Sequence, residues 1–162
     1  MDNAIVAKQQ HPSGHFTLRT MKPADYDAVF ALWQACEGIG LNESDARRLI
    51  GLYLRRNRKL SLVAEVNDQL VGAVLCGHDG RRGYLHHLAV ARGYRRRGIG
   101  RARVAECLAR LHAEGIPKCN IFLFAANTAG RAFWLREGWV ARKELVMLQK
   151  TTKPGAPAGR GS

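Results

Sequence analysis

Arginines and glycines crowd the segment between positions 92 and 103, and their chemistry suits phosphate binding. Guanidinium groups bind and neutralise phosphate oxygens, and glycine, which has no Cβ, lets a ligand approach the backbone closely. The segment therefore predicts a site for a phosphate-bearing anion. The residues concerned are Arg92, Gly93, Arg95, Arg96, Arg97, Gly98, Gly100, Arg101 and Arg103.

Apolar patterns place this segment between a strand and a helix. Tyr84–Val90 is a β-rich run, and apolar residues from Gly98 to Leu111 recur on one helical face. The first amides of a helix have no acceptor inside the helix, and the helix dipole favours an anion beside them. The order of strand, glycine-rich loop and helix start therefore predicts a diphosphate site. A solvated basic helix start without a ligand is the alternative, which the two glycines disfavour.

Two other phosphate-binding motifs do not fit the segment. A dinucleotide fingerprint needs a third glycine at position 103, which is Arg103. A P-loop needs Gly-Lys followed by Ser or Thr, which the segment lacks. Both of these nucleotide-binding classes are therefore excluded.

Four motifs in order along the chain resemble those of the GNAT family of N-acetyltransferases. Arg95–Gly100 matches the acetyl-CoA signature Gln/Arg-x-x-Gly-x-Gly/Ala, and Leu85–Val90 is similar to the family's fourth strand. Asn127 and Phe133–Trp139 are similar to its late Asn and its Phe-Tyr-Glu-x-x-Gly-Phe signature. Several motifs in the right order are far more specific than any one alone. The resemblance extends over residues 16–149, nearly all of the expected domain.

The resemblance implies an α/β (α+β) fold, with a central mixed, mostly antiparallel sheet of about six or seven strands flanked by about four helices. It also implies that acetyl-CoA is the cosubstrate, that no metal takes part, and that a primary amine attacks the thioester directly in a ternary complex. Backbone groups of the fourth strand would bind the pantetheine arm, and residues 96–101 the diphosphate. The expected coenzyme-binding residues are Leu88, Ala89, Val90, Arg95, Arg96, Arg97, Gly98, Ile99, Gly100, Arg101, Asn127 and Trp134.

His86 is the preferred catalytic base, with Tyr84 as a second candidate catalytic residue. Histidines on this strand serve as bases in the arylalkylamine acetyltransferases, whose local sequence is similar. Strand alternation predicts that His86 shares a face with Tyr84 and that His87 points to the other face. An imidazole pKa of about 6.5 suits proton removal near neutrality. The alternative, in which His86 only lines the pocket, stays open at this point.

The chain departs from the family at two positions that matter for catalysis. Trp134 stands where many members carry a Tyr that protonates the departing thiolate, and an indole N–H is no useful acid. Tyr84 and Tyr94 are weaker candidates for that role. Phe122 stands where the ribosomal-protein alanine acetyltransferases carry a Glu base, which disfavours that class of acceptor. An acyl-CoA-binding module without turnover is therefore the second functional hypothesis.

One domain, residues 15–150, is predicted between an N-terminal segment (1–14) and a C-terminal tail (151–162), both expected to be disordered. The late β segment is able to pair two subunits, so a homodimer and a monomer stay open. The predicted strands are 16–19, 60–66, 70–77, 84–90, 118–124 and 139–148, and the predicted helices are 25–36, 42–59, 98–115 and 128–136.

Composition restricts the partners and the compartment. The net charge is +13, from 26 Lys and Arg against 13 Asp and Glu, yet the chain carries no recognisable nucleic-acid motif, so nucleic-acid binding ranks last and no such partner is expected. No apolar run is long enough for a membrane span and no export signal is visible, so a cytoplasmic location is expected, without a membrane partner. Four scattered cysteines are expected to be free, buried thiols, namely Cys36, Cys76, Cys107 and Cys119.

Charged side chains outside the arginine-rich loop carry simpler expectations. Arg103 and Arg110 lie three and four residues from Glu106 on the same predicted helix, so both are expected to form ion pairs with it. The loops 36–45 and 78–83 are expected to shape the acceptor pocket. Attraction of a cationic amine is one role open to Glu37, Glu43 and Asp45, and surface solvation is the preferred expectation.

Overall fold

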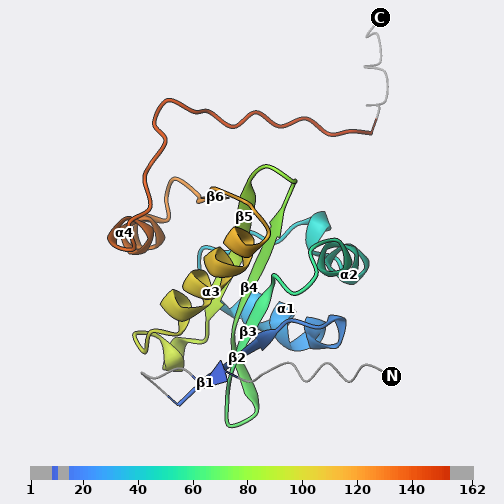
Figure 1. Cartoon of the computed structure of the whole chain (residues 1–162), viewed down its shortest axis with the longest axis vertical. Coiled ribbons are helices and arrows are strands. Elements are labelled where there is room, and N and C mark those ends of the chain that lie inside the picture. Colours follow the sequence, from blue (N-terminus) through green and yellow to red (C-terminus); the bar gives the residue numbers. More distant parts are fainter. Residues whose placement is uncertain (1–8, 11–14, 154–162) are drawn as a thin grey trace, which may run out of the picture.

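A six-stranded sheet lies at the centre of the molecule, with helices on both of its faces (Figure 1). The computed structural model describes residues 9–10 and 15–153. The strands follow one another in sequence order across the sheet, antiparallel up to the fifth, while the sixth runs parallel to the fifth. The predicted mixed, mostly antiparallel sheet is thus confirmed. The strands are β1 (Gln9–Gln10), β2 (Thr17–Thr20), β3 (Leu62–Val66), β4 (Gln69–His78), β5 (Gly83–Val90) and β6 (Cys119–Ile121).

The described residues form four α-helices, as the resemblance implied. Residues that alternate along β4 enter different cores: Leu75 packs with α1 and α2, whereas Val74 packs with α3. The helices α1 and α2 therefore cover one face of the sheet and α3 covers the other (Figure 1). Their bounds are α1 (Tyr26–Ala35), α2 (Arg47–Arg56), α3 (Ile99–Ala113) and α4 (Thr128–Arg136).

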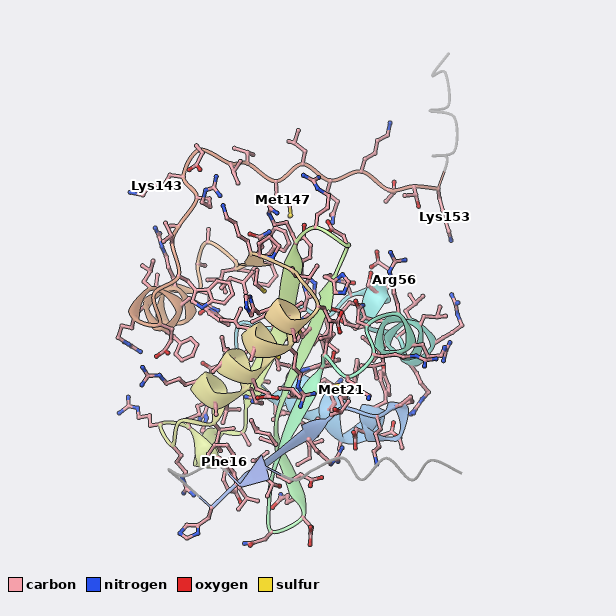
Figure 2. All side chains as sticks on the ribbon, in the orientation of Figure 1. Phe16, Met21, Arg56, Lys143, Met147 and Lys153 are labelled. Atoms are coloured by element: carbon pink, nitrogen blue, oxygen red, sulfur yellow. The ribbon has the colours of Figure 1, made fainter. Side chains whose placement is uncertain are left out.

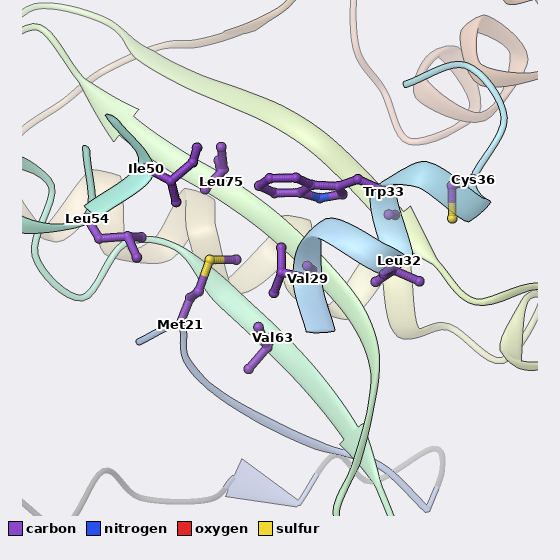
Figure 3. Close-up of a cluster of buried hydrophobic side chains, with 11 residues drawn as sticks. Met21, Val29, Leu32, Trp33, Cys36, Ile50, Leu54, Val63 and Leu75 are labelled. Atoms are coloured by element: carbon purple, nitrogen blue, oxygen red, sulfur yellow. The ribbon is translucent and has the colours of Figure 1, made fainter. Parts of the chain in front are cut away.

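Trp33 fills the core between α1, α2 and the sheet. Its side chain is 1% exposed and lies against Leu75 and Ile50 (Figure 3). Burying a large aromatic ring in this position fixes α1 on β4 and β5 because the ring contributes a large part of the apolar area buried there. The end of α1 and the loop that follows it are thereby held close to β5.

A tight turn joins β3 and β4 in an antiparallel hairpin; β3 lies within the predicted strand 60–66, and β4 matches the predicted strand 70–77 except at its ends. Asn67 and Asp68 both have left-handed backbone angles, with φ of 48° and 62°. Two such residues make the turn whose twist matches that of the flanking strands, and Asn and Asp tolerate this conformation better than most residues.

Two predicted β segments differ from the structure, and two residues of the N-terminal segment that was expected to be disordered form a strand. No strand forms over 139–148; Val146 is 83% and Leu148 is 91% exposed, and the chain from Lys143 to Lys153 extends past the end of β5 (Figure 2). That prediction was wrong because a strand also needs a neighbouring strand for its backbone hydrogen bonds, which an alternating apolar pattern does not provide. The strand predicted over 118–124 is confined to Cys119–Ile121, and Phe124 is 62% exposed. At the N-terminus, Gln9–Gln10 pair with β2, whereas the rest of 1–14 and the tail beyond residue 153 lie outside the described residues.

The two arginines of α3 that were expected to pair with Glu106 differ from each other. Arg110 Nε donates to Glu106 Oε1 at 2.8 Å, which confirms the prediction for that residue. Arg103 does not pair with Glu106, and its side chain is fully buried. The prediction for Arg103 was wrong because position 103 falls on the same buried helical stripe as Cys107 and Leu111.

None of the helices within 15–153 combines the length and the apolar character needed to cross a membrane. Free thiols are found at all four cysteines, and three of them, Cys36, Cys76 and Cys107, are buried as predicted; Cys119 is half-buried.

Candidate functional site

A cavity of about 800 Å³ opens where β5, the loop into α3, and α4 meet. This volume is within the range of small-molecule and cofactor sites. Eleven of the twelve residues predicted to bind the coenzyme line it, together with His86; the exception is Arg97. Two regions distant in sequence, residues 86–101 and residues 127–134, therefore converge on one site. The predicted residues that line it are Leu88, Ala89, Val90, Arg95, Arg96, Gly98, Ile99, Gly100, Arg101, Asn127 and Trp134.

The backbone of the arginine-rich loop is shaped for an anion. Arg96 and Gly98 have left-handed φ angles of 62° and 77°, and α3 begins at Ile99. Alternating hands of backbone conformation direct successive amides to one side, and the amides of the first helical turn have no acceptor within the helix. A Cβ built on Gly98 would meet nothing within 4 Å. The start of α3 thus presents open amides to the cavity.

The arginines of the loop make different contacts. Arg95 Nε donates to the Val90 carbonyl at 3.2 Å, and the Arg97 guanidinium lies 5.2 Å from the centre of the Tyr94 ring. Arg101 pairs with Glu137 at 3.0 Å. None of the ion pairs within 15–153 includes Arg95, Arg96 or Arg97. The charge of these three side chains is therefore available to a phosphate.

A bulge in β5 changes the faces to which the histidines point. Between the pairs Ala73–Ala89 and Leu75–His86, β5 has two residues where β4 has one, and His87 has a φ of 53°. The extra residue turns both histidines toward α1 and α2. The predicted separation of His86 and His87 onto opposite faces was therefore wrong, because simple alternation ends at a bulge.

His86 lies in a row of aromatic side chains on this face. Its ring stacks on Tyr84 at 6.4 Å between centres and meets the edge of Tyr53 of α2 at 6.3 Å, while Tyr84 stacks on Phe122 at 6.0 Å. Burial lowers the pKa of His86, with the neighbouring His87 adding to the shift. The imidazole is therefore neutral near pH 7 and can accept a proton. Tyr84, the second candidate catalytic residue, is not part of the cavity lining.

His87 also lines the cavity and is held by a carboxylate from the α1–α2 connection. Its Nε2 lies 2.7 Å from Oδ1 of Asp45, and its ring meets Trp33 edge-on at 4.9 Å. Asp45 is 4% exposed, so its predicted surface solvation was wrong. The Asn42-x-x-Asp45 capping pattern, in which Asp45 Oδ2 also accepts from the Asn42 amide at 2.9 Å, was the sequence signal for an ordered carboxylate there.

Asn127 and Trp134 have structural contacts in addition to their place in the cavity. Asn127 Oδ1 accepts from the Gly130 amide at 2.9 Å and so caps α4. Trp134 is 7% exposed and packs edge-to-face against Trp139, at 4.9 Å between ring centres, and against Phe133 at 5.2 Å. The indole is thus part of the core under α4 as well as a wall of the site.

The loop after α1, which was expected to shape the acceptor pocket, contributes to the lining of the cavity. Cys36–Gly40 lines it opposite residues 121–124. A Cβ on Gly40 would lie 2.5 Å from Phe124 Cζ, and one on Gly38 would lie 2.7 Å from Asn127 Nδ2. The two glycines allow this close approach.

Comparison with known proteins identifies the family. Residues 26–139 match the acetyltransferase (GNAT) family. An acetyltransferase of Pectobacterium atrosepticum is 35% identical over 112 residues, 69% of this chain and 79% of that protein. One of Sodalis glossinidius is 30% identical over 82% of this chain and 93% of its own length. The chain therefore belongs to the GNAT family of acetyltransferases.

Solved structures agree with this fold. The PaiA N-acetyltransferase from Thermoplasma acidophilum, solved in complex with coenzyme A, superposes with a TM-score of 0.66 at 16% identity, covering 75% of this chain and 87% of that one. The similarity establishes the shared architecture. Within the described ranges, no group of three or more His, Cys, Asp or Glu side chains is placed to hold a metal ion.

Proposed function

We propose that this enzyme transfers the acetyl group of acetyl-CoA to a primary amine of a small molecule or protein, by direct attack in a ternary complex. The observation that carries the proposal is one continuous cavity that joins the amide-rich start of α3 to the bulged β5 and to His86. Such a cavity accommodates a long ligand with an anionic end and a reactive end.

The coenzyme fits this cavity with its diphosphate at Gly98–Gly100, beside Arg95 and Arg96. The open amides and the positive end of the helix dipole bind the phosphate oxygens, and the guanidinium groups neutralise them. The pantetheine arm then follows Leu88–Val90 toward the bulge. Coenzyme A in the Thermoplasma acidophilum neighbour supports this class of ligand.

His86 is positioned to serve as the base, directly or through a water. The amine loses a proton to the neutral imidazole, its nitrogen forms the new bond to the acetyl carbon, and the carbon–sulfur bond breaks to release the thiolate of CoA. Because the thiol pKa is about 8.5, the thiolate is a tolerable leaving group without an acid. Trp134 replaces the family tyrosine that protonates the thiolate. Tyr94, which lines the cavity, and Tyr84 are the candidates for that acid role.

A second function, acyl-CoA binding without turnover, is favoured by Trp134. Its indole replaces the expected acid and is packed into the core with Trp139. Such a module would bind the coenzyme as tightly as an enzyme and release no thiol.

One pair of measurements separates the two functions. Thermal unfolding with acetyl-CoA at one hundred times its dissociation constant should stabilise the protein by about 2.7 kcal/mol. Thiol release with a panel of primary amines then tests transfer. Stabilisation with release supports the enzyme, stabilisation without release supports the module, and no stabilisation rejects both.

A further inference from the structure

Arg103 of α3 is a buried cation in the middle of the fold. Its side chain is 0% exposed, its Nη2 donates to the Ala89 carbonyl at 2.8 Å, and its Nε lies 3.3 Å from the Ile99 carbonyl. Nη1 has no hydrogen-bond partner among the described residues. None of the ion pairs found within 15–153 includes this guanidinium.

This arrangement is costly for stability. A charge removed from water without an opposite charge is unfavourable, and apolar residues of similar volume usually stabilise a core at least as well. Burial lowers the pKa of Arg103 to about 9, so the group still carries its charge near neutral pH. Packing alone would be satisfied by a side chain such as methionine.

The sheet makes room for the guanidinium. A Cβ on Gly72 of β4 would lie 2.8 Å from Arg103 Cζ, and Gly72 pairs with Val90 of β5. A side chain at position 72 would therefore displace the guanidinium. The space under this part of β5 is matched to Arg103.

The two carbonyls that Arg103 contacts belong to the two ends of the proposed coenzyme site. Ile99 is the first residue of α3, where the amides face the diphosphate, and Ala89 lies in the part of β5 that follows the bulge. In an α-helix the side chain points back toward the N-terminus, so Arg103 reaches the first turn as well as the strand. One side chain thus joins the strand to the helix start.

We infer that Arg103 is a positioning residue for acetyl-CoA, holding the pantetheine-binding backbone of β5 in register with the diphosphate-binding first turn of α3. This inference rests on the proposed function. A ligand that engages both ends at once gains affinity only if the ends are held at the right separation, because each contact then becomes effectively intramolecular. Loss of Arg103 should weaken the binding of the whole coenzyme more than the binding of a fragment that reaches only one end.

The test compares Arg103→Met with Arg110→Met by calorimetric titration. Arg110 is on the same helix but pairs with Glu106 and Thr20, away from the cavity. In R103M we expect the dissociation constant of acetyl-CoA to rise about tenfold. The 3′-phosphorylated ADP fragment, which reaches only the α3 end, should keep its affinity within about twofold. The melting temperature of the free protein should not fall, and R110M should bind both ligands as the wild type does.

Each other outcome has a definite meaning. Wild-type protein that fails to bind acetyl-CoA rejects the proposed function and this inference with it. Wild-type binding together with an unchanged affinity in R103M overturns this inference alone. An equal loss of coenzyme and fragment also overturns it, since that pattern indicates general damage. If R103M does not fold, Arg103→Lys decides: a lysine keeps the charge without the fork that reaches both carbonyls, so wild-type affinity in R103K would overturn the inference.

Discussion

Nε2 of His87 lies 2.7 Å from Oδ1 of Asp45, and this contact joins the α1–α2 connection to the bulge of β5. The Asp45 carbonyl also accepts from the Tyr26 hydroxyl at 2.8 Å, so one short turn is connected to α1 and to β5. Both side chains of the pair are largely buried. The α1–α2 connection is therefore fixed to the same strand that lines the proposed coenzyme site.

Removing the carboxylate from this pair should destabilise the fold. Asp45→Ala leaves the buried His87 nitrogen and the Asn42 amide without their acceptor. A hydrogen bond to a charged group contributes about 2 kcal/mol to the free energy of unfolding, so the loss should be of this order. Urea denaturation measures the loss in free energy of unfolding. Glu43→Ala, an exposed neighbour in the same turn, is the control and should change it by less than about 0.5 kcal/mol. Equal stability of both variants would contradict a stabilising role for the pair.

His86→Ala should separate binding from turnover. We expect thiol release with an amine acceptor to fall about a hundredfold, because a positioned base contributes about that factor, while the dissociation constant of acetyl-CoA changes by less than about twofold. Steady-state kinetics and calorimetry give the two quantities. His78→Ala is the matched control, since His78 pairs with Glu114 and does not line the cavity. Undiminished turnover in H86A would remove His86 from the proposed role.

The pH dependence of the reaction follows from the lowered pKa of His86. The neutral base predominates above its folded-state pKa, which burial holds below the ordinary value of about 6.5. The kcat/KM should therefore be level through neutral pH and decline only below about pH 6.5 on its acid side. A decline that begins well above neutrality would show that a different group is the base.

The same shift makes a prediction for stability. The unfolded chain binds the His86 proton more readily than the folded one, so this group lowers the stability as the pH falls through the ordinary pKa toward the folded value. In His86→Gln the free energy of unfolding should change less with pH over that acid range than in the wild type. Chemical denaturation at several pH values measures the slopes, and identical slopes would contradict the assignment.

Charge reversal should distinguish two neighbouring arginines. Arg96 lines the cavity, whereas the guanidinium of Arg97 lies over Tyr94 outside it. Arg96→Glu is expected to raise the dissociation constant of acetyl-CoA about tenfold or more, and Arg97→Glu to have a smaller effect that added salt removes. Titrations at low and at high ionic strength compare them. A larger effect at position 97 would place the phosphates on the other side of the loop.

Local patterns predicted the elements that carry the site. The capping residue Asn127 and the apolar spacing after it give α4 its bounds, Thr128–Arg136, which the structure reproduces. The arginine-rich loop and the start of α3 were equally predictable, because glycine spacing and helix capping are encoded in a few adjacent residues. Eleven predicted coenzyme residues consequently lie around one cavity.

Features that depend on distant partners were not predictable. The bulge at His87 exists because β4 has one residue where β5 has two. The bulged residue is in turn held by Asp45, which lies 42 positions away in the sequence. Burial of Arg103 depends on the space above Gly72. The segment after Trp139 carries an apolar pattern, yet a strand needs a neighbouring edge in register, which sequence alternation does not supply.

The left-handed backbone at His87 also restricts which amino acids position 87 can accept. At a φ of 53°, β-branched side chains collide with their own peptide groups, whereas glycine, asparagine, aspartate and histidine are tolerated. If codon 87 is randomised and the variants are selected for folding, the residues retained should therefore be the few amino acids that this backbone conformation accepts. Only among these amino acids can selection favour the side chain that faces Asp45.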